Sequence, residues 1–236
     1  MGVGQNITAE NAGWTFGGNV PETFVDHIKQ SVPLYELGHD LVCQLSDFFV
    51  HRGSKVYEIG TSTGELIRKL ALHNRGKTGA QFVGFDVEPD MIAQARLHCA
   101  DVPGVKVLLE DARVADMEKA DLIVSYYTMQ FVPPVNRQEM IDKIFDRLNW
   151  GGALIMFEKV RAPDARFQDL ITQLYNEFKL SNGFTSEEIV EKSRSLKGIL
   201  EPFSTQGNLD LLARAGFKDV TTVQKYLCFE GFLAIK

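Results

Sequence analysis

The chain has 236 residues, of which 44% are hydrophobic and 24% charged, the usage of an ordinary globular protein. Its formal net charge of -6 gives no electrostatic reason to bind a phosphate backbone, so nucleic acid is not expected as a partner. The three cysteines, Cys43, Cys99 and Cys228, are too dispersed for a disulfide framework or a paired zinc site. No apolar run approaches the roughly 18 residues of a membrane span. We therefore expect a cytoplasmic protein without a metal site or membrane association.

The first fifty residues predict a helical cover. Residues 1–12 suggest a loose entry, and residues 14–35 mix aromatic and turn residues as in a helix with irregular flanks. Residues 36–51 place apolar side chains at helical spacing, which predicts an amphipathic helix. Residues 1–52 are thus expected to form an N-terminal helical cover.

From residue 55 onward, short β-rich segments alternate with helical ones. The strands are predicted at residues 55–59, 81–85, 105–109, 120–124 and 153–157. The helices are predicted at residues 65–72, 90–99 and 136–148. This alternation indicates βαβ units and a mostly parallel sheet that is buried on both faces.

The remaining residues predict a helical insertion and a closing hairpin. The insertion spans residues 164–203, with one helix at 164–179 and a capping box at Thr185–Glu188 that begins another. A short helix at 208–215 ends at Gly216. Two β-like runs, 218–226 and 228–235, have almost no loop between them and predict an antiparallel hairpin. The whole chain, 1–236, is expected to be one α/β domain with a seven-stranded sheet.

The most informative motif follows the first predicted strand. It reads E-x-G-x-S-x-G, with Glu58, Gly60, Ser62 and Gly64 leading into a helix. Glycine lets the backbone approach a ligand closely, and the helix start offers free N–H groups. Ser62 breaks the dinucleotide fingerprint, and the lysine of a P-loop is missing. What remains resembles motif I of the class I S-adenosylmethionine-dependent methyltransferases, which implies their Rossmann-like fold and S-adenosylmethionine as cofactor.

Acidic residues follow the next two predicted strands. Asp86 can accept hydrogen bonds from both ribose hydroxyls of a nucleoside, although it could instead cap the helix after it. In the resembled superfamily, an acidic residue at the place of Asp111 meets the adenine amino group, although Asp111 alone could be a surface carboxylate. Open α/β sheets bind ligands at the carboxyl edge, where these strand ends lie.

A more specific resemblance covers the chain from Trp14 to its C-terminus. The sequence is similar to the carboxy-S-adenosylmethionine synthases of tRNA wobble-uridine modification. The matching segments are Trp14-Thr-Phe16, Ser31-Val-Pro-Leu-Tyr35, the glycine turn, Thr128-Met-Gln-Phe131, Gly151-Gly-Ala-Leu154, Glu158-Lys159, Phe178-Lys179, Asn182-Gly183 and Ala215-Gly-Phe217. The resemblance implies that Tyr35 and Gly60 meet the amino-acid end of the cofactor, Asp86 its ribose, and Asp111 with Ala112 its adenine.

Two positions depart from this family. Tyr126 stands where the family has asparagine, and Ser193 stands where the family has the arginine that grips the extra carboxylate of its product. Arg194 is one place further along, a rotation of about 100° on a helix. Because an unpaired buried carboxylate costs several kcal/mol, these departures favour ordinary methyl transfer to a small metabolite.

The sequence thus supplies two sets of site residues. The expected cofactor-binding residues are Tyr35, Glu58, Gly60, Thr61, Ser62, Gly64, Asp86, Val87, Met91, Asp111, Ala112, Tyr126 and Phe131. The candidate catalytic residues are Tyr126, Tyr127, Tyr175, Asn176 and Arg194. Aromatic faces can stabilise a sulfonium, and a hydroxyl or amide can orient an acceptor.

Other readings of the site stay open. They are carboxy-S-adenosylmethionine synthesis, cyclisation of the cofactor with release of methylthioadenosine, and a non-enzymatic cofactor sensor. The helical insertion could cover a small-molecule substrate or form a homodimer interface equally well.

Overall fold

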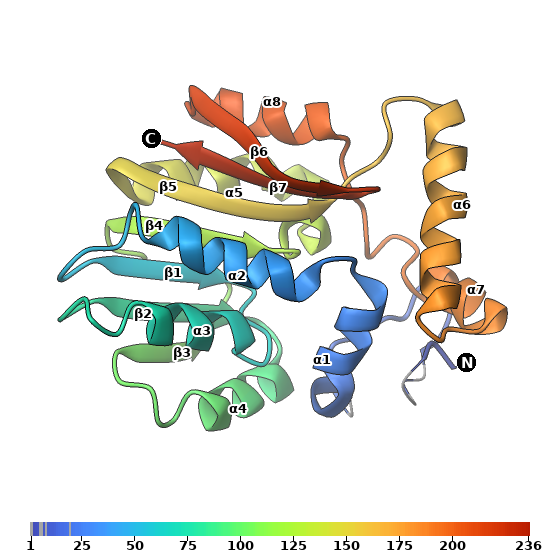
Figure 1. Cartoon of the computed structure of the whole chain (residues 1–236), viewed down its shortest axis with the longest axis horizontal. Coiled ribbons are helices and arrows are strands. Elements are labelled where there is room, and N and C mark those ends of the chain that lie inside the picture. Colours follow the sequence, from blue (N-terminus) through green and yellow to red (C-terminus); the bar gives the residue numbers. More distant parts are fainter. Residues whose placement is uncertain (1, 5–6, 8, 19) are drawn as a thin grey trace.

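The computed structural model describes residues 2–4, 7, 9–18 and 20–236, and within them seven strands form one sheet in the order β3-β2-β1-β4-β5-β7-β6 (Figure 1). The parallel strands are β1 (Lys55–Ile59), β2 (Gln81–Asp86), β3 (Val105–Leu109), β4 (Ala120–Tyr126) and β5 (Leu148–Lys159). The hairpin of β6 (Asp219–Tyr226) and β7 (Phe229–Ile235) places β7 antiparallel to β5. The predicted fold class, with its mostly parallel sheet and closing hairpin, is confirmed.

Helices cover both faces of the sheet (Figure 1). One apolar core joins the strands to α2 (Tyr35–Ser46), α3 (Glu65–His73) and α4 (Pro89–His98). A second core joins them to α5 (Pro134–Arg147) and α8 (Thr205–Ala215). Burial on both faces explains why the central strands are almost wholly apolar in sequence.

The two largest differences from the sequence-based boundaries are five residues each. Strand β5 begins at Leu148, five residues before the predicted start, because its pairing with β4 carries a register shift that accommodates Gly151 at positive φ. Helix α2 ends at Ser46, before the apolar pattern does, because the chain turns there to enter β1. Phe48 is left exposed by that turn.

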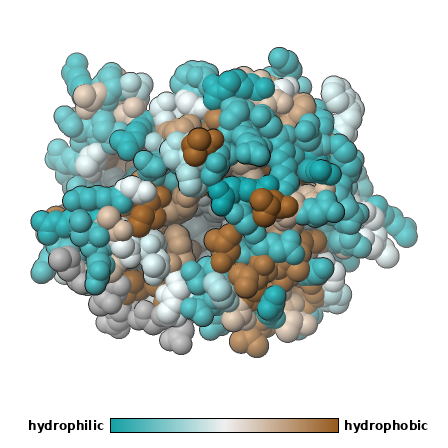
Figure 2. Space-filling view, turned by 180° about the vertical axis from the view of Figure 1, so that it is seen from behind, coloured by the Kyte–Doolittle hydropathy of each residue, from teal (hydrophilic) through white to brown (hydrophobic). Residues whose placement is uncertain are grey.

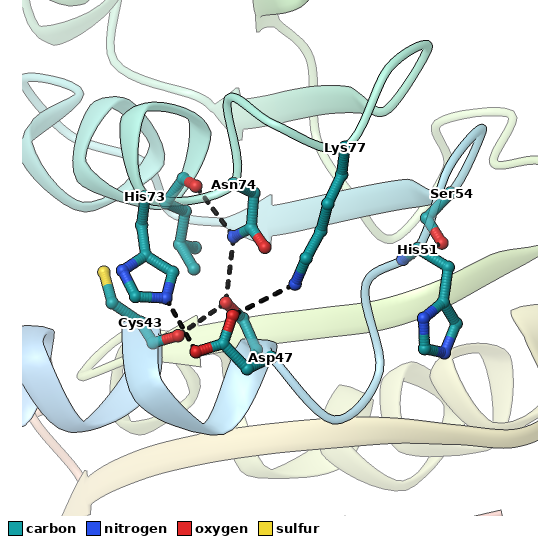
Figure 3. Close-up of polar contacts among 9 residues, drawn as sticks. Cys43, Asp47, His51, Ser54, His73, Asn74 and Lys77 are labelled. Carbon is teal, nitrogen blue, oxygen red and sulfur yellow. Dashed lines mark hydrogen bonds and ion pairs between the residues drawn. The ribbon is translucent and has the colours of Figure 1, made fainter.

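A buried polar network fastens α2 to α3 at the edge where β1 begins (Figure 3). Asn74 Nδ2 donates to Ser46 Oγ at 2.9 Å, and Ser46 Oγ donates to the Cys43 carbonyl at 2.6 Å. Nearby, Asp47 accepts from Lys77 Nζ at 3.1 Å and pairs with His73, but this contact is exposed. The network holds α2 at the end of the sheet away from the carboxyl edge.

Replacing Ser46 with alanine should lower the free energy of unfolding by about 1–2 kcal/mol, because the buried Asn74 amide loses one of its two acceptors and keeps only the Leu70 carbonyl. Urea denaturation measures this effect. Asp47→Ala is the adjacent control and should cost no more than about 1 kcal/mol, since its ion pairs are exposed. A Ser46→Ala variant as stable as the wild type would show that the network does not hold α2.

Helices α1 (Val20–Ser31), α6 (Ala165–Ser181) and α7 (Ser186–Ser195) lie beyond the carboxyl ends of the parallel strands (Figure 1). The capping box at the start of α7 is confirmed, because Thr185 Oγ1 accepts from the Glu188 amide while the Glu188 carboxylate accepts from Thr185 N. These helices form the wall that faces the carboxyl edge.

The described part of the N-terminal segment packs against this wall. Ala12 N donates to the Arg194 carbonyl at 3.0 Å and Trp14 N to the Ser195 carbonyl at 3.2 Å. Val3 and Ile7 are buried, so the expectation of a loose entry is wrong for these two residues. In the described residues, no helix is long and apolar enough to cross a membrane.

Candidate active site

A cavity of about 870 Å³ lies at the carboxyl edge, bounded by the ends of β1 to β5 and by α1, α6 and α7. Its volume is within the range of small-molecule sites. Seen from behind, the molecule is hollowed near the centre of its face, with apolar residues beside the hollow (Figure 2). Every predicted site residue except Gly64 lines this cavity.

The glycine turn is shaped by the strand beside it. Gly60 has φ of +74°, and a Cβ there would overlap the side chain of Thr128. Gly60 N and Thr61 N both donate to the Phe85 carbonyl, at 2.8 and 2.9 Å. The turn therefore lies flat against the end of β2, with its backbone open to the cavity.

Gly64 differs from the rest of the predicted cofactor set in where it lies. It lies outside the cavity lining, at the N-cap of α3, with φ of +84°. A Cβ at Gly64 would come within 3.0 Å of the Cys99 sulfur and 3.2 Å of the Ala95 Cβ. Its role is to let α3 pack closely against α4.

Glu58 lies under the glycine turn. Its carboxylate accepts from Thr61 Oγ1 at 2.6 Å, and the residue is only 3% exposed. Burial raises the pKa of Glu58 to about 8. The geometry makes Glu58 a support for the turn as well as part of the cavity wall.

Asp86 holds the turn from the neighbouring strand. Its Oδ2 accepts from Ser62 N at 2.8 Å and its Oδ1 accepts from Glu88 N at 3.0 Å. Burial raises the pKa of Asp86, although these N–H donors oppose that shift. Asp86 does not cap α4, whose N-cap is Glu88, so the capping alternative is wrong. Each carboxylate oxygen keeps a lone pair that can accept a ribose hydroxyl.

Asp111 carries a partner that the sequence reasoning missed. Arg113 Nε and Nη2 donate to its Oδ2 at 2.9 and 2.6 Å, and these hydrogen bonds lower the pKa of Asp111. Such a fork fixes the carboxylate plane at the end of β3. The i, i+2 spacing of an aspartate and an arginine could have suggested this pair.

Tyrosine rings form a floor between the glycine turn and α6. Tyr126 lies 5.3 Å from Tyr35 and 4.8 Å from Tyr127, measured between ring centroids. The Tyr126 hydroxyl donates to the Tyr35 carbonyl at 2.6 Å, and the Tyr175 hydroxyl donates to the Ser31 carbonyl at 2.9 Å. Both hydroxyls are therefore used by the fold.

Tyr127 differs from the other two. It has φ of +58°, a conformation costly for a bulky residue, and its buried hydroxyl has no hydrogen-bond partner in the described residues. A strained residue with an unpaired polar atom on a cavity wall is the arrangement expected at a binding site. Of these three tyrosine hydroxyls, only that of Tyr127 lacks a hydrogen bond within the described residues.

The other candidate residues contribute less defined contacts. Phe131 packs edge-on against Phe16 at 5.1 Å. Asn176 lines the cavity from α6. Arg194 also lines it, but its side chain is half-exposed and its guanidinium pairs with Glu191 on the same helix at 2.7 Å. The charge of Arg194 is therefore paired within α7.

The sequence reasoning also passed over three lysines on the cavity wall. Lys159 is the last residue of β5, Lys179 is near the end of α6, and Lys192 lies on α7. Within the described part of the chain, no His, Cys, Asp and Glu side chains are grouped to hold a metal ion.

Removal of the Asp86 carboxylate tests the ligand register directly. Asp86→Ala should weaken binding of S-adenosylmethionine by roughly 1.5–3 kcal/mol, the scale of a lost charged hydrogen bond. Isothermal titration calorimetry measures this change. Glu88→Ala, two residues along and outside the expected ribose contacts, is the matched control. Equal affinities for Asp86→Ala and the wild type would contradict the placement of the ribose.

Comparisons with known proteins agree with this geometry. Residues 57–154 match the family model described as a methyltransferase domain. The human N-acetylserotonin methyltransferase, solved with S-adenosylmethionine, has a similar fold with a TM-score of 0.63 at 16% identity, covering 92% of this chain and 56% of that one. The methyltransferase SibL gives a TM-score of 0.63 at 16% identity, covering 93% of this chain and 60% of that one.

The sheet order and the glycine turn at its carboxyl edge define a class I S-adenosylmethionine-dependent enzyme of the methyltransferase superfamily. A carboxy-S-adenosyl-L-methionine synthase of Staphylococcus epidermidis is 36% identical over 94% of this chain and 97% of its own length. One from Campylobacter lari is 34% identical over 94% of each. The chain belongs to the carboxy-S-adenosyl-L-methionine synthase family, and its cofactor is S-adenosylmethionine.

Proposed function

We propose that this enzyme transfers the methyl group of S-adenosylmethionine to a small metabolite bound in the same cavity. The supporting observation is that one enclosed space brings together the turn at Gly60, the carboxylates of Asp86 and Asp111, and the tyrosine floor. The cavity volume of about 870 Å³ leaves room for a second small molecule beside a nucleoside cofactor.

The cofactor, when bound, supplies a methyl group that is electrophilic because it is attached to a sulfonium. The protein's own task is then to bind, orient and exclude water. In this proposal Asp86 and Asp111 accept hydrogen bonds from the nucleoside, and the faces of Tyr35 and Tyr127 stabilise the positive charge; all four residues line the cavity. Holding two reactants in line can supply roughly 7–11 kcal/mol of the barrier reduction at best.

A second candidate is the activity that names the family, carboxy-S-adenosylmethionine synthesis. Ser193 stands where that activity would require an arginine, but Lys159, Lys179 and Lys192 bring cationic groups to the same cavity. Those lysines are the specific observation in its favour, because any one of them could pair with a carboxylate.

One incubation separates these reactions. The purified protein is given S-adenosylmethionine, alone or with the small-molecule fraction of a cell lysate, and the products are identified by mass spectrometry. S-adenosylhomocysteine formed only with the lysate fraction supports methyl transfer. A cofactor that gains the mass of a carboxylate supports the second candidate. Methylthioadenosine formed from the cofactor alone, or tight binding without turnover, would contradict both.

A further inference from the structure

The chain turns sharply after β3, over residues 111–115, and we call this segment the β3 turn. The Asp111 carbonyl accepts hydrogen bonds from Val114 N at 3.0 Å and from Ala115 N at 2.8 Å. Ala112 and Ala115 are buried in the core that joins the sheet to α5. Asp111 and Ala112 also line the cavity, so the turn belongs both to the core and to the cavity wall.

The β3 turn offers the cavity a hydrogen-bond acceptor and a donor side by side. The acceptor is the Asp111 carboxylate. The donor is the backbone amide of Ala112, which donates to no group in the described residues although Ala112 is only 6% exposed. Because buried amides are nearly always paired in folded proteins, this amide points to a ligand atom that accepts from it.

This pair of groups matches one edge of adenine and opposes the same edge of a 6-oxopurine. Adenine has an amino donor at C6 beside the N1 acceptor, whereas hypoxanthine has an oxygen acceptor at C6 beside an N1–H donor. An ionised carboxylate can only accept hydrogen bonds, so it attracts the amino group and repels the oxygen. The wrong purine would also leave the Ala112 amide without an acceptor.

Arg113 keeps the Asp111 carboxylate in its accepting form. Besides the side-chain fork on Asp111, the Arg113 backbone N donates to Asp111 Oδ1 at 2.9 Å. These hydrogen bonds lower the pKa of Asp111, so the carboxyl group stays ionised at neutral pH. A carboxylate has about four lone-pair positions, and the N–H groups of Arg113 occupy most of them. What remains can accept from one amino group in a fixed direction.

Lys143, on α5, holds the β3 turn from the side of the core. Its Nζ donates to the carbonyls of Ala112, Arg113 and Ala115, at 2.9, 3.0 and 2.6 Å. An ammonium group has three N–H donors, so Lys143 gives all of them to this one turn.

These contacts also fix the direction of the free amide. Because the peptide bond is planar and trans, Ala112 N–H points opposite to the Asp111 carbonyl, which is held inside the turn by Val114 and Ala115. Lys143 fixes the peptide planes that follow, since it holds their carbonyls.

We propose that Arg113 and Lys143 are positioning residues that make the cavity selective for a 6-aminopurine nucleoside. Arg113 acts through the Asp111 carboxylate, and Lys143 acts through the backbone of the β3 turn. The proposal deepens the proposed function, and it rests on the placement of the nucleoside given there.

Calorimetric titration with S-adenosylhomocysteine and with its 6-oxo analogue, S-inosylhomocysteine, measures this selectivity. The wild type should bind S-adenosylhomocysteine more tightly by about a hundredfold or more, because a site that pairs with polar groups rejects a ligand that leaves them unpaired. Asp111→Asn is the reference variant. Its side-chain amide can both donate and accept, so the affinity ratio should fall by about tenfold or more.

Arg113→Met and Lys143→Met should each narrow the affinity ratio by about fivefold or more, the effect of roughly one net hydrogen bond. Lys143→Arg keeps several N–H donors and should restore part of the ratio. Lys119→Met is the matched control, because the Lys119 ammonium also donates to a backbone carbonyl, that of Asp146, but lies outside the cavity lining. This control should keep the wild-type ratio.

Urea denaturation shows whether each variant is folded. A folded variant that keeps the wild-type ratio, or that weakens both ligands by the same factor, overturns the positioning role of that residue. Arg113 is exposed, so its replacement leaves a test even if Lys143→Met does not fold. A wild-type protein that binds both nucleosides alike overturns the selectivity itself. The proposed function fails separately, by absence of turnover in the incubation above, because these binding measurements need no reaction.

Discussion

Replacing Gly60 with alanine should weaken S-adenosylmethionine binding by a hundredfold or more and lower the free energy of unfolding by about 2–4 kcal/mol. The left-handed backbone at Gly60 costs a residue with a Cβ about 1–2 kcal/mol. The new Cβ would also overlap the side chain of Thr128. The overlap can be relieved only by moving the turn, and the turn is the surface that the cofactor is expected to cross. Calorimetry and urea denaturation measure the two effects.

Gly53 provides a control with the same backbone conformation. Its φ is +75°, but nothing lies within 4 Å of an added Cβ. Gly53→Ala should therefore cost only the backbone part, about 1–2 kcal/mol, and leave cofactor binding intact. Removing the obstacle in the double variant Gly60→Ala/Thr128→Gly should restore part of the binding. If Gly60→Ala binds the cofactor like the wild type, the turn is not a contact surface.

The sequence predicts most of the fold because the strands are buried on both faces. The limits of β1 and β3 agree with the predicted ones to the residue, since apolar runs there end at turn residues. The predicted strand starts only after Gly151 and Gly152, whereas both glycines lie within β5, where the pairing is irregular. Local patterns do not report such a pairing.

The site is less predictable for a physical reason. The order of Gly60, Asp86 and Asp111 along the chain is enough to bring them to one sheet edge, because parallel strands all end there. Gly64 fits the same motif, but its conformation serves helix packing. Lys179 and Lys192 reach the cavity only because α6 and α7 fold back over the edge, and no spacing in the sequence encodes that.

Replacing Lys179 with methionine should stabilise the ligand-free protein, by on the order of 1–2 kcal/mol at pH 7. Methionine fills similar space without a charge, so repulsion from Lys159 and the cost of burial both disappear. Loss of the contact with the Tyr175 ring, about 1 kcal/mol, offsets part of this gain. Most substitutions of a buried residue destabilise, so a gain would identify the lysine as a strained, ligand-directed group.

The pH dependence of the free energy of unfolding tests independently whether Lys179 destabilises the folded protein. The folded-state pKa of Lys179, about 8, lies below its ordinary value of 10.5, so the unfolded chain binds more protons between these values. The destabilisation by Lys179 is therefore complete below pH 8, and it shrinks as the pH rises towards 10.5. The advantage of Lys179→Met over the wild type, measured by urea denaturation, should fall across pH 8 to 10. Lys218→Met, which changes an exposed lysine outside the cavity lining, is the matched control and should show no such trend.

Two outcomes would contradict this prediction: a Lys179→Met variant that is less stable than the wild type at pH 7, or a stability advantage that does not change with pH. Either would mean that the charge of Lys179 does not destabilise the folded protein.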